Sequence, residues 1–392
     1  MRKKVILLIG TLSGGGAERV VSNLSLNFPD QIEKEIVLFG KEAKVDYEYV
    51  GKITYLDRDR PKGLISKVVT FINRIKKLNK IKKENAGVSV ISFLEYPNLL
   101  NMMTFNTKNS IVSVRNFMST KHQKGMKAFF WNLSIKLLYK RAQKIIVVSK
   151  EMKEDLIENY DLTREKITVI YNFYSIDKIQ ELAKKRLENN EKDIFKDPTI
   201  ITVGRLSKQK GQHHLLRSFK KVKQLVPNAQ LVILGEGELK STLIKIADEL
   251  DLLGSIHYMG FQENPFKYIY SSKVFIMTSY YEGFPNALAE AMACGTPVIS
   301  TDCQSGPREI LAPNEYKGSI NYGIQHDRFG ILVPDPSAKE SELVEKFLAN
   351  SIVSVLMKEE IYNHFSKRSF ERVKDFDTDN VIVEWLDIIE SN

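Results

Sequence analysis

The chain contains little cysteine and no long apolar segment. Only Cys294 and Cys303 are cysteines among its 392 residues, which is too few for a disulfide framework or a cysteine-based zinc site. No uninterrupted apolar run approaches the roughly 18 residues that a membrane-spanning helix requires. The six histidines form no metal-ligand pattern either. These absences favour a cytoplasmic protein without a bound metal.

Acidic residues are missing from two long stretches of the first half. Residues 1–172 carry a net charge of +14, and the remainder carries −4. Residues 61–83 hold eight Lys or Arg and residues 108–150 hold ten, with no Asp or Glu in either stretch. Apolar residues such as Phe129 and Phe130 alternate with these charges at helical spacing, and some of them must face a core. The remaining basic, aromatic surface suits the anionic inner face of a cell membrane, whereas no recognised nucleic-acid motif accompanies it.

Length and apolar patterning predict two α/β domains, because 392 residues exceed what one ordinary core accommodates. In each half, short apolar runs alternate with longer helical patterns, which predicts parallel sheets with helices on both faces. We expect an amino-terminal domain over residues 1–172 and a carboxy-terminal domain over 173–375, facing each other across a cleft. A helix within 376–392 is expected to pack back on the first domain. The predicted strands are Val5–Ile9, Glu35–Phe39, Ser89–Phe93, Ile111–Val114, Ile145–Val148, Ile167–Tyr171, Thr199–Val203, Gln230–Leu234, Ser255–Met259, Val274–Met277, Val298–Ser300 and Gly330–Val333.

The segment between Glu282 and Glu290 is the most informative part of the chain. The apolar run Val274–Met277 predicts a buried strand, and Pro285 suits the first turn of a helix over Asn286–Ala293. Glu282 then lies in a loop at the carboxyl end of a strand, where open α/β sheets bind ligands, and Glu290 lies about two turns into the helix. For a lone glutamate, an ordinary solvent-facing position is the alternative. The backbone amides at this helix start suit a phosphate, and they are those of Asn286, Ala287 and Leu288.

Three further turns of the second half are expected at the same edge of the sheet. Residues 204–211 join a strand to a helix, and their Arg205 and Lys210 are placed to reach one diphosphate, unless they form only a solvated basic loop. Gly235 ends the next strand, and residues 305–309 follow yet another. Such convergence is what a pocket for a nucleotide sugar requires.

A Gly-rich loop follows the first predicted strand and opens a helix. Its Gly14, Gly15 and Gly16 let the backbone turn tightly and approach a phosphate or a sugar. Arg19 stands where the dinucleotide-binding fingerprint needs its third glycine, which weakens an interpretation as a dehydrogenase.

Together these motifs resemble the glycosyltransferases of family 4, which have the GT-B architecture of two facing Rossmann-like domains. The resemblance covers nearly the whole chain, and the two glutamates eight positions apart are its most specific part. The motifs are Gly-Gly-Ala-Glu-Arg at 15–19, Gly-Arg-Leu at 204–206 with Lys-Gly at 210–211, Gly-Glu-Gly-Glu at 235–238, Glu-Gly-Phe-Pro at 282–285 with Glu290, Pro-Val-Ile-Ser-Thr-Asp at 297–302, Gly-Pro-Arg-Glu at 306–309 and Gly-Ile-Leu-Val-Pro at 330–334.

The resemblance implies a role for each of these residues. Arg205 and Lys210 would hold the donor diphosphate and stabilise the leaving nucleotide without a metal. Glu282 would bind hydroxyls of the donor sugar, and Glu290 would bind those of the ribose. The amides at 286–288 would add to the diphosphate site, and the Gly-rich loop would leave room for donor and acceptor. Similar enzymes transfer the sugar with retention of configuration, with the leaving phosphate as base, so no protein nucleophile is required.

The chain departs from the family pattern in its first half. Many relatives carry a His in the loop where this chain has Ser-Val-Arg115-Asn116. Arg115 and Asn116, with Glu95 at the end of the preceding strand, are therefore the candidates for contacts with acceptor or sugar. Asp-Arg-Asp at 57–59 and Asp-Thr-Asp at 377–379 echo the metal-binding motif of another transferase architecture, but neither follows a convincing central strand. We interpret both as surface charge.

These observations predict a metal-independent, retaining glycosyltransferase without a cofactor, associated peripherally with the inner face of the cell membrane. It would move a hexose or N-acetylhexosamine from a nucleotide diphosphate sugar, with UDP favoured, to a lipid-linked glycan in capsule-type or other cell-surface polysaccharide synthesis. One alternative is a nucleotide-sugar 2-epimerase of the same architecture. Another is a non-catalytic protein that binds a sugar nucleotide or an anionic surface.

Overall fold

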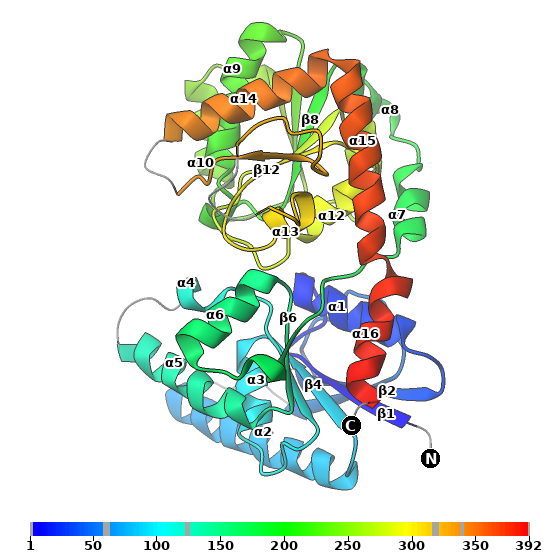
Figure 1. Cartoon of the computed structure of the whole chain (residues 1–392), viewed down its shortest axis with the longest axis vertical. Coiled ribbons are helices and arrows are strands. Elements are labelled where there is room, and N and C mark those ends of the chain that lie inside the picture. Colours follow the sequence, from blue (N-terminus) through cyan, green and yellow to red (C-terminus); the bar gives the residue numbers. More distant parts are fainter. Residues whose placement is uncertain (1–2, 58–62, 122–125, 316–320, 338–340, 391–392) are drawn as a thin grey trace. The chain divides into compact units, whose positions relative to one another are not determined.

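The chain divides into two compact units. The structure, a computed structural model, describes residues 3–57, 63–121, 126–315, 321–337 and 341–390 (Figure 1). Unit 1 comprises Met1–Phe173 together with Thr378–Asn392, and unit 2 comprises Tyr174–Asp377. These boundaries lie one and two residues from the expected ones. Within the described ranges, none of the helices combines the length and the apolarity needed to cross a membrane.

Unit 1 is built on a seven-stranded parallel sheet of order β3-β2-β1-β4-β5-β6-β7. Its strands are β1 (Lys3–Leu8), β2 (Ile32–Gly40), β3 (Lys52–Asp57), β4 (Ser89–Phe93), β5 (Ser110–Ser113), β6 (Lys144–Val147) and β7 (Ile167–Val169). Its helices are α1 (Gly16–Asn27), α2 (Leu64–Glu84), α3 (Glu95–Met102), α4 (Met118–Lys121), α5 (Met126–Leu138), α6 (Lys150–Tyr160) and α16 (Thr378–Glu390).

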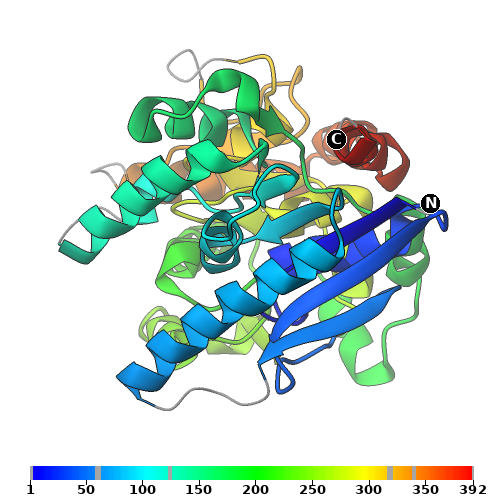
Figure 2. The ribbon, with the colours of Figure 1, turned by 90° about the horizontal axis from the view of Figure 1, so that it is seen from below.

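Alternate side chains of β1 enter two different cores, because successive residues of a strand point to opposite faces of its sheet. Val5 and Leu7 pack in one cluster with residues of α1 and α16, whereas Ile6 and Leu8 pack in another with Leu78 of α2. Figure 2 shows α2 lying along the strands of the amino-terminal sheet. Both faces of the sheet are therefore covered, as its parallel strands require.

The edge strand β3 is the strand that the sequence did not predict. Only its last two residues, Leu56 and Asp57, are buried, so the apolar signal is weak. Asp57 forms an ion pair with Arg74 of α2, and the Arg74 Nη2 lies 2.5 Å from the Asp57 carboxylate. This ion pair gives Asp57 a structural partner, while Asp59 of the same motif lies outside the described residues.

Unit 2 holds a six-stranded parallel sheet of order β10-β9-β8-β11-β12-β13. Its strands are β8 (Thr199–Val203), β9 (Gln230–Leu234), β10 (Ile256–Gly260), β11 (Val274–Met277), β12 (Val298–Thr301) and β13 (Ile331–Val333). Its helices are α7 (Ile176–Ala183), α8 (Asn189–Lys192), α9 (Gln212–Leu225), α10 (Lys240–Glu249), α11 (Phe266–Ser271), α12 (Asn286–Ala293), α13 (Pro307–Leu311), α14 (Ser341–Met357) and α15 (Glu359–Val373).

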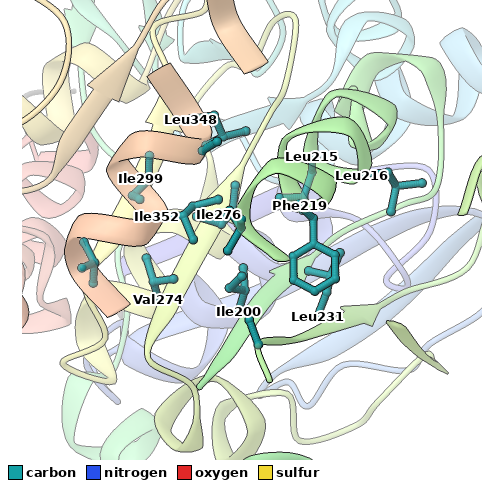
Figure 3. Close-up of a cluster of buried hydrophobic side chains, with 14 of the residues drawn as sticks. Ile200, Leu215, Leu216, Phe219, Leu231, Val274, Ile276, Ile299, Leu348 and Ile352 are labelled. Atoms are coloured by element: carbon teal, nitrogen blue, oxygen red, sulfur yellow. The ribbon is translucent and has the colours of Figure 1, made fainter. Parts of the chain in front are cut away.

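One apolar cluster of unit 2 joins α9 and α14 to a face of this sheet. Figure 3 shows Phe219 of α9 beside Leu231 of β9, and Leu348 and Ile352 of α14 beside strand residues that include Ile276. All of these side chains are fully or almost fully buried. The cluster packs α9 and α14 against the sheet, and both helices contribute residues behind the candidate site described next.

Candidate functional site

The turns predicted to carry the site lie at one edge of the unit 2 sheet. Strands β8, β9, β11 and β12 belong to one parallel sheet, so their carboxyl ends meet at the same edge. The predicted turns at 204–211, 235–237, 282–290 and 305–309 follow these four strands in that order. Adjacent turns touch directly, since the Gly204 amide donates to the Leu234 carbonyl at 3.0 Å.

Lys210 and Glu282, which are 72 positions apart in the sequence, form an ion pair at this edge. The Lys210 Nζ lies 2.6 Å from the Glu282 Oε1, and the Ser279 hydroxyl donates to the same oxygen at 2.6 Å. Glu282 is only 8% exposed. A buried carboxylate with two donors is held in one orientation, and the partly exposed ammonium beside it retains capacity for an anion.

The turn after β8 and the loop after β11 are joined by backbone contacts as well. The Tyr280 amide donates to the Gln209 carbonyl at 2.8 Å, and the Thr278 hydroxyl donates to the Lys210 carbonyl at 2.9 Å. Gly211 has a φ of +59°, and a Cβ there would collide with the Thr278 carbonyl. Glycine therefore allows the two segments to approach closely enough for the Lys210–Glu282 pair.

Arg205 is an exposed cation of this edge. The backbone of Arg205 is fixed, because its carbonyl accepts a bond from the Gln212 side chain at 3.0 Å and the neighbouring Leu206 amide donates to the Glu236 carbonyl at 3.0 Å. Its guanidinium is at the surface. An exposed guanidinium on a fixed backbone is well suited to binding a diphosphate, because it can donate two parallel hydrogen bonds.

The helix α12 starts where the sequence predicts and spans the predicted residues. Its first amides, those of Asn286 and Ala287, precede the first bonds inside the helix. The Leu288 amide already donates to the Pro285 carbonyl at 3.1 Å, so that predicted phosphate donor is engaged within the protein. The Asn286 side chain accepts a bond from the Tyr174 hydroxyl at 2.7 Å, and Glu290 is 5% exposed in the second turn.

The segment after β12 supports the loop that precedes α12. The Ser305 hydroxyl donates to the Gly283 carbonyl at 3.0 Å, and Ser305 itself has a φ of +67°, which is unfavourable for a residue with a side chain. A Cβ at Gly306 would lie 2.6 Å from the Pro285 ring. The Gly-Pro-Arg-Glu motif therefore contacts this loop through its backbone, and Arg308 forms an ion pair with Asp302.

Gly235 has a close neighbour in the protein itself. Its φ is +127°, and a Cβ would collide with the Gly204 carbonyl. We expect Gly235→Ala to destabilise unit 2 by about 1–3 kcal/mol and to displace the Gly204–Arg205 turn, because the new methyl group strains both strand ends. Denaturant unfolding and UDP binding measure the two effects. Gly254→Ala is the matched control, since a Cβ there meets nothing within 4 Å, and equal stability of the two variants would contradict the expectation.

Phe261 is a candidate site residue that the sequence analysis did not include. It follows β10 at the same edge, is 77% exposed, and adjoins Gly260, whose carbonyl accepts the Gly235 amide at 2.7 Å. An exposed ring at a ligand-binding edge provides a stacking surface for a planar group such as a nucleobase. The available signal was the Gly-Phe pair directly after a predicted strand.

In unit 1, the Gly-rich loop leads into α1 as predicted, but its glycines have different surroundings. A Cβ on Gly14 would meet nothing within 4 Å, whereas one on Gly15 would collide with the Glu18 carboxylate. Burial raises the pKa of Glu18, although a bond from its own backbone opposes the shift. Gly16 is the first residue of α1. Open space for a ligand is therefore found at Gly14, while Glu18 occupies the space beside Gly15.

The three candidates of the first half separate into a pair and a buried residue. The Asn116 amide donates to the Glu95 carboxylate at 2.9 Å, and Glu95 follows Leu94, whose φ of +72° is strained for a residue with a side chain. Arg115 is buried instead. Its guanidinium carbon lies 5.4 Å and 5.7 Å from the ring centroids of Phe93 and Trp385, and its Nη1 lies 2.6 Å from the Asn172 side chain.

The contact of Arg115 with acceptor or sugar stays a prediction, and the structure adds a structural contact for its side chain. Trp385 belongs to α16, so the guanidinium helps to attach this helix to unit 1. A sequence pattern that placed Arg115 beside Asn116 could not show that the two side chains have different partners. Within the described ranges, no group of three or more His, Cys, Asp or Glu is arranged to hold a metal ion.

Comparison with known proteins identifies the family. The model "Glycosyltransferase Family 4" matches residues 14–178, and "Glycosyl transferases group 1" matches residues 184–369. An uncharacterised glycosyltransferase of Methanocaldococcus jannaschii is 36% identical over 378 residues, which are 92% of this chain and 89% of that protein. The chain belongs to the glycosyltransferases of family 4. The N-acetylgalactosamine-N,N'-diacetylbacillosaminyl-diphospho-undecaprenol 4-alpha-N-acetylgalactosaminyltransferase of Campylobacter jejuni is 33% identical over 80% of this glycosyltransferase and 85% of that one.

The glycosyltransferase also shares its fold with solved structures. The crystal structure of Anabaena HepE in complex with UDP matches it with a TM-score of 0.77 and 17% identity over the whole of both chains. TarM matches it with a TM-score of 0.76 and 14% identity over 99% of both chains. The predicted fold class, a GT-B architecture of two doubly wound α/β domains, is confirmed.

Proposed function

We propose that this glycosyltransferase moves a hexose or N-acetylhexosamine from a UDP-sugar to a lipid-linked glycan, with retention of configuration and without a metal. The observation that carries the proposal is the edge of unit 2, where the Lys210–Glu282 pair adjoins the turn that carries Arg205. A single edge thus supplies two cations for a diphosphate and a fixed carboxylate for sugar hydroxyls.

Each group at this edge has a task in the proposed reaction. Arg205 and Lys210 bind the diphosphate and stabilise the negative charge that grows on it as the bond to the sugar breaks. Glu282 accepts bonds from hydroxyls of the donor sugar, and Glu290 accepts those of the ribose. Phe261 stacks on the base. The leaving phosphate takes the proton of the attacking acceptor hydroxyl, so the protein supplies position and charge rather than a nucleophile.

Two relatives support the choice of substrates. The HepE structure contains UDP, which supports a UDP-sugar donor. The Campylobacter enzyme is named for an acceptor carried on diphospho-undecaprenol, which supports a lipid-linked glycan acceptor for the present chain.

A donor screen tests the proposal directly. The enzyme is incubated with labelled UDP-sugars and a pool of lipid-linked acceptors, and nucleotide release, lipid-linked label and free nucleotide sugars are measured. We expect release of UDP together with transfer of label to the lipid fraction. Epimerised free nucleotide sugar would instead support a 2-epimerase, and binding without turnover of any donor would support a non-catalytic protein.

We also propose that unit 1 provides the surface that contacts the membrane. On α2, Ile65, Val68, Val69 and Ile72 repeat every three or four residues and are 46% to 82% exposed. The same face of α2 carries the exposed Lys76, Lys80 and Lys83 toward the carboxyl end of the helix.

Helix α5 carries a second stripe of the same kind. Its Phe129, Phe130, Leu133 and Leu137 are 39% to 64% exposed. Helix α3 contacts both α2 and α5, so the three helices share one side of unit 1. Apolar side chains flanked by lysines match the boundary between acyl chains and anionic head groups. Of the basic residues counted from the sequence, Lys62 and Lys124 lie outside the described residues.

Sedimentation with vesicles of mixed neutral and anionic lipid tests this surface. We expect binding that weakens as salt rises from about 50 to 500 mM, because screening shortens the reach of the lysine charges to a few ångströms. The double substitution Ile65→Ser/Ile72→Ser should lower binding by about tenfold, because it removes apolar area that the membrane would bury. Met357→Ser, at an exposed apolar residue of unit 2, is the matched control. Salt-insensitive or absent binding contradicts the proposed surface.

A further inference from the structure

A tyrosine hydroxyl lies between two histidines behind the candidate site. The Tyr280 oxygen is 2.9 Å from the His214 Nε2 and 3.3 Å from the His213 Nε2, and the centroids of the two imidazole rings are 4.1 Å apart. We call these three residues the His–Tyr–His cluster. His214 is buried and His213 is half-buried at the start of α9, directly after the turn that carries Lys210.

With both imidazoles neutral, one set of tautomers satisfies every bond of this cluster. Glu345 of α14 lies 3.5 Å from the His214 Nδ1, so the proton of that ring belongs on Nδ1. His214 Nε2 is then an acceptor for the Tyr280 hydroxyl, whose oxygen in turn accepts the N–H of His213. His214 must be neutral for this pattern to hold, because its Nε2 accepts the bond, whereas His213 keeps its N–H donor in either charge state.

The cluster fixes the segment that carries the donor-binding residues. Tyr280 is two residues before Glu282, and its amide is bonded to Gln209, one residue before Lys210. Its hydroxyl anchors the same loop to the first turn of α9, at the other end of the Lys210 turn. The loop is thus attached on both sides of Lys210, once through the backbone and once through the Tyr280 hydroxyl.

We propose that the His–Tyr–His cluster is a positioning device that holds the Lys210–Glu282 pair in the geometry for donor binding. The inference rests on the proposed role of that pair, and it extends it to residues that do not touch the donor. If the Tyr280 hydroxyl loses its two partners, the loop after β11 has fewer attachments to α9. The distance between Lys210 and Glu282 can then vary more widely. Misplacement of a binding group by about 1 Å is enough to lower turnover strongly.

The charges around the cluster favour neutral histidines. Burial, followed by smaller contributions from His214 and Arg217, lowers the pKa of His213 to about 4. Burial also lowers the pKa of His214, although Glu345 opposes this shift. The charged groups that face the cluster are Arg217 on α9, Glu345 on α14 and Asp335 after β13.

The sign of the pH dependence follows from these lowered pKa values. The unfolded chain takes up protons on its histidines near pH 6.5, whereas the folded chain resists them until the pH is lower. The stabilising contribution of the cluster is therefore complete above about pH 6.5 and is lost as the pH falls toward 4. UDP affinity should weaken over the same range, because a protonated His214 can no longer accept the bond from the Tyr280 hydroxyl that holds the loop.

The first experiment uses Tyr280→Phe, which keeps the ring and removes the hydroxyl. We expect UDP affinity, measured by calorimetry, and kcat to fall by about two- to tenfold each, the range expected for one lost hydrogen bond. Tyr270→Phe, at a half-exposed tyrosine on α11, is the control and should leave both unchanged. Unchanged affinity and kcat in Tyr280→Phe would overturn the inference.

The second experiment compares the pH dependence of the wild type with that of His213→Gln/His214→Gln, which cannot titrate. Between about pH 7 and 4.5, we expect the wild-type melting temperature to fall by about 5 °C more than that of the variant. The wild type should also lose UDP affinity over this range, while the variant keeps a flat profile. Parallel pH profiles overturn the inference. A wild type that binds no UDP contradicts the proposed function, and the melting curves then still decide whether the cluster titrates as inferred.

Discussion

Arg205→Ala is expected to lower kcat by about 10²-fold or more while leaving the fold intact. Arg205 is exposed at the candidate site, and no other side chain of the turn at 204–211 has a guanidinium that can donate two parallel hydrogen bonds. If Arg205 stabilises the charge on the leaving nucleotide, its contribution is greatest in the transition state, so kcat falls more than substrate affinity. Initial rates of UDP release at saturating donor measure the effect.

Arg186→Ala provides the control for this prediction. Arg186 is an exposed arginine of the same unit, in the segment before α8, so its replacement removes the same charge away from the site. Its kcat should equal that of the wild type. A loss confined to KM in Arg205→Ala would show that the guanidinium binds donor and transition state equally, and it would refute the proposed stabilisation of the leaving group.

Glu282→Ala is expected to lower kcat by about 10²-fold, as Arg205→Ala does, but to change substrate binding differently. The carboxylate lies 2.6 Å from the Lys210 ammonium and accepts the Ser279 hydroxyl, so its removal leaves the lysine without its buried partner. If Glu282 also binds hydroxyls of the sugar, affinity for the UDP-sugar should fall by about 10²-fold. Affinity for UDP alone should change much less, because UDP has no donor sugar and Lys210 keeps its charge.

Two further variants separate the contact with sugar from the structural role of Glu282. Glu282→Gln keeps the volume and one acceptor oxygen but loses the charge that pairs with Lys210. Glu249→Ala, at an exposed glutamate near the end of α10, removes a carboxylate of the same unit without touching the site. Equal losses of UDP and UDP-sugar affinity in Glu282→Ala would assign this residue to Lys210 alone and refute a contact with the donor sugar.

Much of unit 2 could be predicted from the sequence because its signals are local. The strands β8, β9 and β11 and the helix α12 have the predicted bounds. Each strand is a short, mostly apolar run, and α12 lies between Pro285 and Gly295. Strand β3 was missed because most of it is half exposed at the edge of its sheet. Its residues therefore do not form the short buried apolar run that marks the other strands.

Side-chain partners were less accessible to the same reasoning. The pairing of Lys210 with Glu282 joins residues 72 positions apart, and it exists because β8 and β11 are neighbours in the sheet. The contacts of His214 with Tyr280 and Glu345 span 66 and 131 positions. From the sequence, the histidines could be described only as lacking a metal-ligand pattern.

The sequence by itself determined the family, the two α/β units and the turns at which chemistry is concentrated. These depend on periodicity and on glycine and proline, which act over a few residues. Only the tertiary structure decided that the Arg115 guanidinium lies over the Trp385 ring, that Glu95 and Asn116 form a pair, and that Tyr280 lies between two histidines. The direction of a side chain is set by strand order and by the packing of distant helices, and no local pattern contains that information.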